Sequence, residues 1–238
     1  MSLAGGQRSL QTQVLEDLER AANWRRWLCD LALPHLGEDP LEIGSGMGYY
    51  GEDLVAHLPA LTVSEADPDR LIALRERFYG RPQVHVRPLV VPIAERATHS
   101  AVVSFNVLEH IEDDVEALSS FAGLVRPGGA VVVLTPACPF AMSPFDREIG
   151  HLRRYTRRSL TDAAQKAGLV VEQVRHVNSL GLLAWIVIMK LLRRRPGASA
   201  AQGIWDQRIV PWMRRCEQHV TPPFGQTLLL VARVPDRG

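Results

Sequence analysis

Apolar residues recur at helical spacing in several segments of the chain, with charged and polar residues between them. This periodicity is typical of helices that bury one face against a core. The segments expected as helices are Leu10–Leu33, Tyr49–His57, Asp69–Phe78, Asp113–Val125 and Thr156–Ala167. Pro34 is expected to end the first of them, because proline disrupts a continuing helix.

Short, continuous apolar runs lie between these helices and after them. The expected strands are Pro40–Ile43, Leu61–Ser64, Val84–Arg87, Ala101–Phe105, Ala130–Leu134, Leu169–Val174 and Thr227–Val234. Strands that are apolar on both faces, alternating with helices, favour a parallel sheet covered by helices on each side. The pattern therefore predicts an α/β fold.

The alternation changes after His176. Residues Leu180–Arg195 predict a very apolar helix that ends in three arginines, and Ile204–Cys216 predict a second helix. We expect residues 177–225 to form a helical insertion before the last strand. Three interpretations stay open: a lid over a hydrophobic substrate, a peripheral membrane contact through residues 180–195, and a core helix or homodimer contact.

Composition places the chain among ordinary globular proteins. It has 238 residues, of which 46% are hydrophobic and 22% charged, so we expect a folded chain and not a mainly disordered one. We expect one domain, with residues 1–36 as a helical segment, 37–176 as a ligand-binding core and 226–238 carrying the last strand. The net charge of +1 gives no reason to expect a nucleic-acid partner.

The cysteines and histidines give no sign of a disulfide framework or a metal site. Cys29, Cys138 and Cys216 are far apart, and the histidines are scattered along the sequence. The first residues lack the charged start and apolar run of a secretion signal. We therefore expect a cytoplasmic protein without a bound metal.

A glycine-rich loop, Glu42-Ile-Gly44-Ser-Gly46-Met-Gly48, follows the first strand and opens a helix. Such loops let backbone N–H groups approach a ligand closely. The loop also fits the dinucleotide fingerprint, with Glu65 near the position of a ribose-binding acid, so an NAD(P)-dependent Rossmann oxidoreductase is one hypothesis. Glu42 argues against it, because a carboxylate there repels a diphosphate and attracts a cationic ligand.

Two later elements complete a pattern with this loop. They are Asn106-Val-Leu-Glu-His-Ile111, after a strand, and the turn Arg126-Pro-Gly-Gly129. With them the chain resembles class I S-adenosylmethionine-dependent methyltransferases, and Gly150–Thr156 resembles a small-molecule subgroup of these enzymes. The resemblance implies a Rossmann-like, mostly parallel seven-stranded sheet with helices on both faces, and S-adenosylmethionine as the cofactor.

The resemblance also implies a cofactor site. Its residues are Glu42, Gly44, Gly46, Gly48, Glu65, Asp67 and Asn106. The glycines would let the methionine part of the cofactor lie close to the backbone past the first strand. Glu42 would help to hold the loop and the ammonium region, and Asn106 would lie next to both the cofactor and the acceptor. Glu65 would accept both ribose hydroxyls, with Asp67 as its rival.

His110, His151 and Tyr155 are the catalytic candidates. His110 follows a strand end and could act as a base, or it could only pack against the next helix. His151 and Tyr155 share a face if their segment is helical, and arginines surround them. This favours an acceptor pocket for an anionic group, with a solvated basic loop as the alternative.

We therefore expect a methyltransferase that acts on a small, partly apolar molecule, with oxygen as the expected methyl acceptor. Two positions depart from the family pattern: Leu89 replaces a polar adenine-binding residue, and Ser100 replaces an aspartate. These departures leave a non-catalytic methyltransferase-like scaffold open as a further hypothesis, beside the oxidoreductase.

Overall fold

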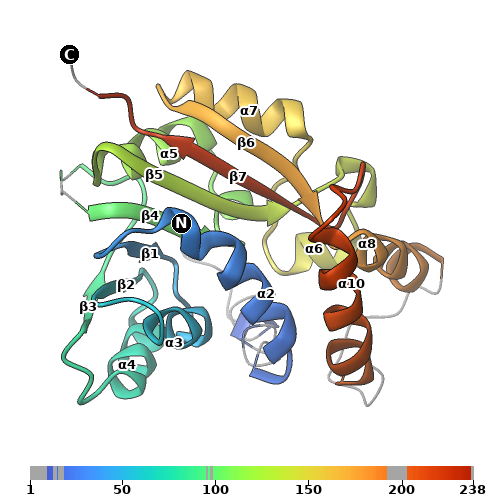
Figure 1. Ribbon diagram of the computed structural model, residues 1–238, viewed down its shortest axis with the longest axis horizontal. Coiled ribbons are helices and arrows are strands. Elements are labelled where there is room, and N and C mark those ends of the chain that lie inside the picture. Colours follow the sequence, from blue (N-terminus) through green and yellow to red (C-terminus); the bar gives the residue numbers. More distant parts are fainter. Residues whose placement is uncertain are drawn as a thin grey trace.

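A seven-stranded sheet with strand order β3-β2-β1-β4-β5-β7-β6 forms the centre of the computed structural model (Figure 1). The model describes residues 10–12, 15, 19–94, 96, 99–191 and 203–236. The strands are β1 (Leu41–Ile43), β2 (Leu61–Glu65), β3 (Val84–Pro88), β4 (His99–Phe105), β5 (Val125–Pro136), β6 (Val170–Val177) and β7 (Thr227–Arg233). Strands β1 to β5 run parallel, and β7 is antiparallel to both β5 and β6. The predicted fold class is confirmed.

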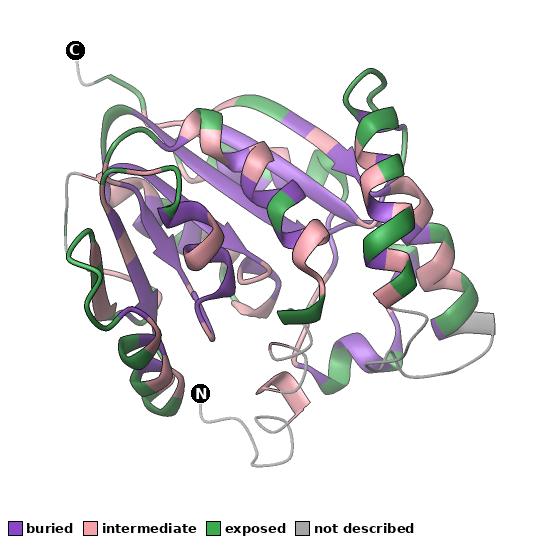
Figure 2. Cartoon of the chain, turned by 60° about the horizontal axis from the view of Figure 1, so that its bottom comes forward, coloured by how far each residue is buried: buried purple, intermediate pink, exposed green. Residues whose placement is uncertain are grey.

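Helices cover both faces of the sheet because its side chains alternate between two apolar cores. On one face lie α5 (Asp114–Gly123) and α7 (Arg157–Lys166), and on the other lie α2 (Ala22–Ala32), α3 (Tyr49–Val55) and α4 (Pro68–Arg77). On β4, Val102 faces the first core and Val103 the second. Figure 2 shows the central strands buried along most of their length and the outer helix faces exposed, whereas the edge strands β3 and β6 are less buried.

Two element boundaries differ from the sequence expectation. The long N-terminal helix is interrupted at Ala21, whose φ of −97° and ψ of 49° are not helical, and parts of residues 10–18 lie outside the description. Strand β5 begins at Val125, so the expected turn at Pro127–Gly129 belongs to the start of that strand. Gly128 supplies the left-handed backbone, with φ 75°, that this irregular start requires.

The segment before β7 is helical, as predicted. It contains α8 (Ser179–Trp185), a π-helical turn at Ile186–Leu191, a second at Trp205–Ile209, and α10 (Val210–Glu217). Residues 192–202, including the arginine cluster, lie outside the described part of the chain. Val210 and Met213 are buried in the core shared with α2, which supports the core-packing interpretation for α10.

Two buried carboxylates attach this segment to the rest of the fold. Glu217 accepts hydrogen bonds from the backbone N–H of Asn178 at 2.9 Å and of Ser179 at 2.8 Å, at the start of α8. Asp206 accepts hydrogen bonds from the N–H groups of Asn23 and Trp24 at the start of α2. Both carboxylates satisfy otherwise unpaired helix donors and lie at the positive ends of helix dipoles.

None of the helices described is both long and apolar enough to cross a membrane.

Replacing Glu217 should destabilise the fold, because two backbone donors and the Ser179 hydroxyl lose a buried charged acceptor. We expect Glu217→Ala to lower the free energy of unfolding by about 2–4 kcal/mol, measured by urea denaturation. Glu172→Ala, which removes a carboxylate from an exposed ion pair with Arg233, should cost less than about 1 kcal/mol. Equal effects of the two substitutions would contradict the capping role.

Candidate functional site

The glycine loop lies between the carboxyl end of β1 and the start of α3. Gly44 and Gly48 adopt left-handed backbone conformations, with φ values of 71° and 81°. A Cβ atom at Gly44 would lie 2.6 Å from Val107, and one at Gly48 would lie 2.7 Å from Leu74. Side chains are therefore excluded at both positions, and the loop presents bare backbone to a ligand.

Glu65 holds this loop from the end of β2. Its Oε2 accepts a hydrogen bond from the N–H of Gly46 at 2.8 Å, and its Oε1 accepts from the N–H groups of Ala66 and Asp67. A carboxylate has further lone pairs, so these bonds leave acceptor capacity for ribose hydroxyls. The Asp67 side chain instead caps the N-terminus of α4, accepting from the N–H groups of Asp69 and Arg70.

Glu42 is buried beneath α3, where a Cβ atom added to Gly51 would lie 2.9 Å from Glu42 Oε2. That oxygen has no hydrogen-bond partner. Burial, reinforced by the nearby charge of Glu65, raises the pKa of Glu42 to about 8, although a hydrogen bond with Ser45 opposes the shift. The raised pKa favours the neutral form of the Glu42 carboxyl, and its expected role at the ammonium region of the cofactor stays a prediction.

Asn106 turns the chain out of β4. It has a left-handed φ of 54°, and its N–H donates to the carbonyl of Leu134 on β5 at 2.8 Å. The next residues form a 3₁₀ turn, η2 (Leu108–His110). This turn brings Glu109 and His110 to the carboxyl end of the sheet, beside the glycine loop that Val107 contacts.

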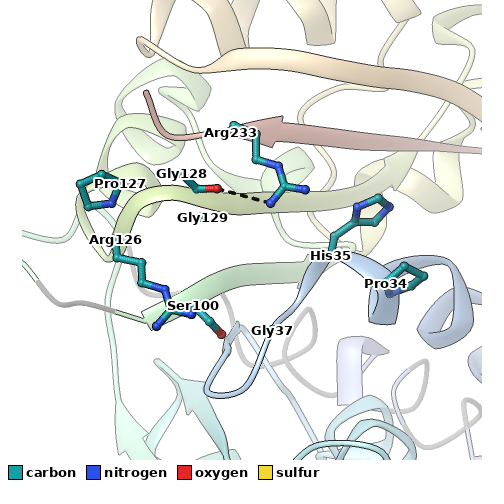
Figure 3. A pocket seen from close by; sticks show the side chains of 9 residues that line it. All are labelled: Pro34, His35, Gly37, Ser100, Arg126, Pro127, Gly128, Gly129 and Arg233. Atoms are coloured by element: carbon teal, nitrogen blue, oxygen red, sulfur yellow. Dashed lines mark hydrogen bonds between the residues drawn. The ribbon is translucent and has the colours of Figure 1, made fainter. Parts of the chain in front are cut away.

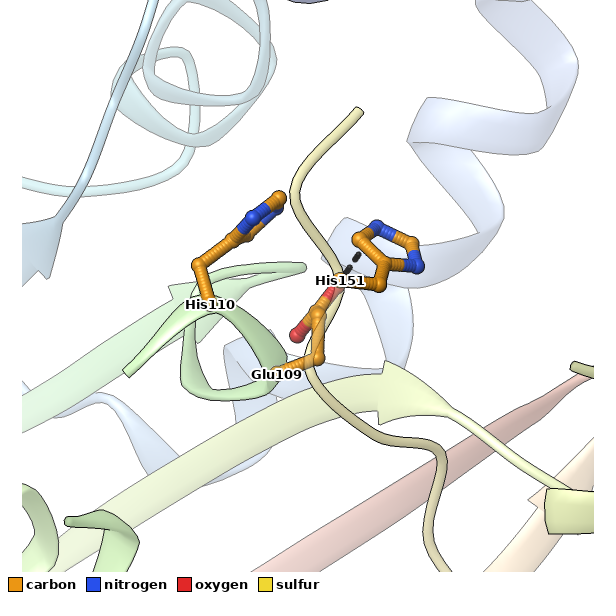
Figure 4. Close-up of side chains that lie close together, drawn as sticks. All are labelled: Glu109, His110 and His151. Carbon is orange, nitrogen blue, oxygen red and sulfur yellow. Dashed lines mark ion pairs between the residues drawn. The ribbon is translucent and has the colours of Figure 1, made fainter. Parts of the chain in front are cut away.

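Glu109, His110 and His151 converge at this end of the sheet (Figure 4). The two imidazole rings meet edge to face, with centroids 4.7 Å apart. Glu109 is fully buried; its Oε2 accepts from the Thr135 hydroxyl at 3.0 Å, and its Oε1 lies 3.7 Å from His151 Nε2. No metal site was expected, because the histidines are scattered along the sequence. The fold nevertheless places His110 and His151 side by side.

Burial strongly affects His110 and Glu109. Desolvation, with a smaller contribution from the neighbouring His151, lowers the pKa of His110 to about 4. Desolvation also raises the pKa of the Glu109 carboxyl, although His151 opposes this shift. His110 Nδ1 lies 3.0 Å from the carbonyl oxygen of Gly150. Because a carbonyl can only accept, Nδ1 carries the proton in the neutral ring and Nε2 has a free lone pair.

Asp146 holds the His151 ring in place through its Nδ1 atom, the ring nitrogen that does not face Glu109. It is fully buried in the short helix α6 (Pro144–Glu148), whose first turn Ser143 caps reciprocally. Its Oδ1 lies 3.0 Å from His151 Nδ1 and accepts from Arg154 Nη2 at 2.7 Å. Burial alone would raise the pKa of Asp146, but the hydrogen bonds from His151 and Arg154 outweigh it and hold that pKa well below its usual range.

Tyr155 does not join this group. Residues 151–154 are not helical, so the premise that His151 and Tyr155 share a helix face is wrong. The Tyr155 hydroxyl donates to Asp114 at 2.9 Å, and burial with this carboxylate raises the pKa of Tyr155 far above its usual value. The arginines are also engaged, since Arg153 pairs with Asp114 and Arg154 with Asp146.

An apolar wall stands beside the imidazoles. It is formed by Leu10, Phe145, Ile149, Trp185 and Met189. Gln11 bridges the apolar wall and α4. Its side-chain amide donates a hydrogen bond to the carbonyl of Ile149 at 2.5 Å and accepts one from the Arg70 guanidinium at 3.2 Å. Part of the N-terminal segment therefore lies across the carboxyl ends of the strands.

Comparison with known proteins gives the family. A model described as a methyltransferase domain matches residues 14–174. The chain belongs to this methyltransferase family. A probable S-adenosylmethionine-dependent methyltransferase of Mycolicibacterium smegmatis is 28% identical over 193 residues, covering 73% of this chain and 69% of that protein. An uncharacterized methyltransferase of Mycobacterium tuberculosis is 33% identical over 114 residues, covering 47% of this chain and 57% of that protein.

A solved structure confirms the fold. A chain in the complex of the Haloferax volcanii Trm112 methyltransferase activator with a methyltransferase superposes with a TM-score of 0.67. It covers 98% of this chain and 100% of that one, at 15% identity. The chain is thus an S-adenosylmethionine-dependent methyltransferase of class I, as predicted, and the oxidoreductase hypothesis is dropped.

The residues present fit this cofactor. A Cβ atom at Gly44 would clash with Val107, so the loop stays free of side chains there, and the Glu65 carboxylate at the end of β2 bonds to this loop, where a ribose with two hydroxyls can bind. Leu89, where the family pattern has a polar residue, is buried in an apolar core cluster. Its side chain therefore cannot hydrogen-bond an adenine.

A hollow lies at the opposite end of the sheet from the glycine loop, at the amino ends of β4 and β5 (Figure 3). It has a volume of about 360 Å³, and Ser100, Arg126 and Arg233 contribute to its lining. Ligands of doubly wound sheets bind at the carboxyl ends of the strands, so we do not assign the reaction to this hollow. Ser100 has a structural role there: its hydroxyl donates to the carbonyl of Leu36 and accepts from the N–H of Asp39.

Sequence reasoning did not single out Asp146, and it treated Glu109 only in passing. The pattern Ser143-Pro-Phe-Asp146 is a helix-capping signature that could have located α6. No local signal could have placed Glu109 against His151, because that contact joins a strand end to a distant loop, whereas Asp146 and His151 are only five residues apart.

The buried carboxyl of Glu42 should make stability depend on pH. Because its folded-state pKa of about 8 exceeds the unfolded value of 4.5, unfolding releases a proton between these limits. Its contribution to the free energy of unfolding therefore falls as pH rises, by up to about 1.4 kcal/mol per pH unit. Because the lowered pKa of His110 opposes this slope below pH 6.5, we compare the variants between pH 6.5 and 8. There we expect Glu42→Gln to make the slope less negative in urea denaturation, and the exposed control Glu116→Gln to leave it unchanged. An unchanged slope in Glu42→Gln would refute this account.

Proposed function

We propose that this methyltransferase transfers the methyl group to an oxygen atom of a small, partly apolar molecule. The observation that carries the proposal is the convergence of two imidazoles, His110 and His151, at the carboxyl ends of the strands beside the cofactor loop. A hydroxyl must lose its proton as it is methylated, and an imidazole lone pair accepts a hydroxyl hydrogen bond. A neutral amine attacks with its own lone pair and loses its proton afterwards, whereas a hydroxyl needs a base during the transfer.

The apolar wall supports the partly apolar character of the acceptor. Phe145 and Trp185 lie with ring centroids 6.2 Å apart, and Ile149 immediately precedes the loop that carries His151. A ligand pocket is usually lined by apolar side chains, with a few polar groups that fix orientation. We do not extend the proposal to an anionic acceptor, because Arg153 and Arg154 already pair with carboxylates.

The roles of the residues follow from this placement. Bound S-adenosylmethionine supplies an electrophilic methyl group on a positively charged sulfur. The glycine cradle and Glu65 fix the position of the donor, and Asn106 and the apolar wall orient the acceptor. His110 receives the hydroxyl proton as the new O–C bond forms and the S–C bond breaks, with the electron pair of that bond remaining on sulfur. Tyr155 has no place in this scheme, since its hydroxyl is bonded to Asp114.

Cofactor binding can be tested with two neighbouring carboxylates. We expect S-adenosylmethionine and S-adenosylhomocysteine to bind the wild type in calorimetric titrations, and Glu65→Gln to weaken both by tenfold or more. Asp67→Asn is the matched control, because an asparagine side chain can still cap α4. NAD should not bind any of the three proteins. Loss of affinity in Asp67→Asn with none in Glu65→Gln would reverse the assignment of the ribose partner.

Methyl transfer can be tested with labelled S-adenosylmethionine and a panel of small phenols, alcohols, amines and carbon acids. We expect label only in O-methyl products. On the best acceptor, His110→Ala should lower kcat by about 100-fold or more with a smaller change in KM. The control His57→Ala alters an exposed residue away from the site. Label in amines alone, or full rate in His110→Ala, would overturn the proposal.

A further inference from the structure

When both rings are neutral and Glu109 is ionised, three atoms with free lone pairs face one another in the Glu109–His110–His151 cluster. Each residue offers one ligand atom, and these atoms all lie within 4.8 Å of one another. Glu109 is fully buried, yet its Oε1 has no hydrogen-bond partner. A buried, unpaired carboxylate oxygen is costly, so its presence requires a compensating partner.

The hydrogen bonds made by the Nδ1 atoms of His110 and His151 determine which ring nitrogens remain free to bind a ligand. His110 Nδ1 donates to the Gly150 carbonyl, and His151 Nδ1 donates to the Asp146 carboxylate. In the neutral rings, both Nε2 atoms are then free lone pairs. His151 Nε2 points at Glu109 Oε1 across 3.7 Å, which is too long for the charge-assisted hydrogen bond of about 2.7–2.9 Å that a shared proton would form.

We propose that Glu109, His110 and His151 bind a divalent transition-metal ion of the zinc type. Two imidazole nitrogens and one carboxylate oxygen are a donor set of catalytic zinc sites, whose remaining position is open to water or substrate. Ligand atoms of a tetrahedral site with metal–ligand distances of about 2.1 Å lie about 3.4 Å apart. Of the present separations, the one between His151 Nε2 and Glu109 Oε1, 3.7 Å, is already close to this value, and all three atoms lie within 4.8 Å of one another.

The surroundings match those of metal ligands in known sites. A ligating histidine typically donates its other N–H to a carboxylate or a backbone carbonyl, which fixes the tautomer and the ring orientation. Asp146 does this for His151, and Gly150 does it for His110. The Thr135 hydroxyl holds the second oxygen of Glu109 at 3.0 Å, leaving Oε1 directed at the imidazoles.

The open position gives the ion a chemical role, and this part of the inference rests on the proposed function. An acceptor hydroxyl bound to the ion in place of water would have a lowered pKa and lose its proton to solvent. Its oxygen would then take the methyl group as the S–C bond breaks and sulfur keeps the electron pair. In the ion-bound enzyme this route would replace the proton transfer to His110 that the proposed function describes for the site without a metal. Binding of the ion itself needs no methyl transfer.

The test is titration of the chelator-treated protein with ZnCl₂, followed by calorimetry. We expect one ion per chain, and an affinity at least tenfold weaker in Glu109→Gln and in His110→Gln. Two control variants should bind like the wild type: His57→Gln, which removes an exposed histidine, and Cys216→Ser, which removes an exposed thiol that zinc could otherwise occupy.

A second measurement covers the case in which a substitution in the buried cluster unfolds the chain. Co²⁺ added to the wild type should broaden the ring-proton NMR signals of His110 and His151 and leave those of His57 sharp. Absence of zinc binding, unchanged affinity in both cluster variants, or Co²⁺ broadening only elsewhere would overturn the metal site. S-adenosylmethionine titrated into the same samples separates the two proposals, since its failure to bind would remove the function but not the ion.

Discussion

The winding of the chain outward from two adjacent strands is the constraint on which the site depends. From β1 the chain proceeds through α3 and α4 toward the β3 edge, and from β4 it proceeds toward β5 and the other edge. The connections after these strands therefore leave in opposite directions and open a crevice at the carboxyl ends. The glycine loop fills one side of it, and η2 fills the other. Gly44 against Val107 is the point where the two sides meet, which is why a side chain is excluded there.

The ionised Asp146 carboxylate determines the arrangement of the loop that faces this crevice. It accepts hydrogen bonds from the Ser143 hydroxyl and N–H, the Arg154 guanidinium and the His151 ring. A buried ion pair of this kind adds little net stability, but loss of one partner is costly, so the arrangement is strongly selected over alternatives. Arg154 also stacks over Trp185 at 4.8 Å, which links the charge to the apolar wall.

Local pattern was enough to predict an α/β fold and a glycine-rich loop, because both depend on short-range signals, whereas the seven-stranded sheet and the cofactor followed from the resemblance to methyltransferases. Apolar runs mark buried strands, and glycines at fixed spacing mark a turn with left-handed backbone, as at Gly44 and Gly48. The chemistry of the acceptor side was less accessible. His110 was singled out because it follows a strand end, whereas the pairing of Tyr155 with His151 depended on a helix that residues 151–154 do not form. His151 and Glu109 meet only through the tertiary fold.

The buried carboxyl groups of the site differ in how their charge is compensated, and this difference indicates where a ligand belongs. Glu65 accepts hydrogen bonds from three backbone N–H groups, and Asp146 accepts hydrogen bonds from a guanidinium and an imidazole. Glu42 lies under α3, where its raised pKa favours a proton over a charge. Glu109 has one oxygen satisfied by Thr135 and the other directed at two imidazole lone pairs. A proton resolves the cost of burial at Glu42, whereas the geometry around Glu109 suits a cation that three donors can share.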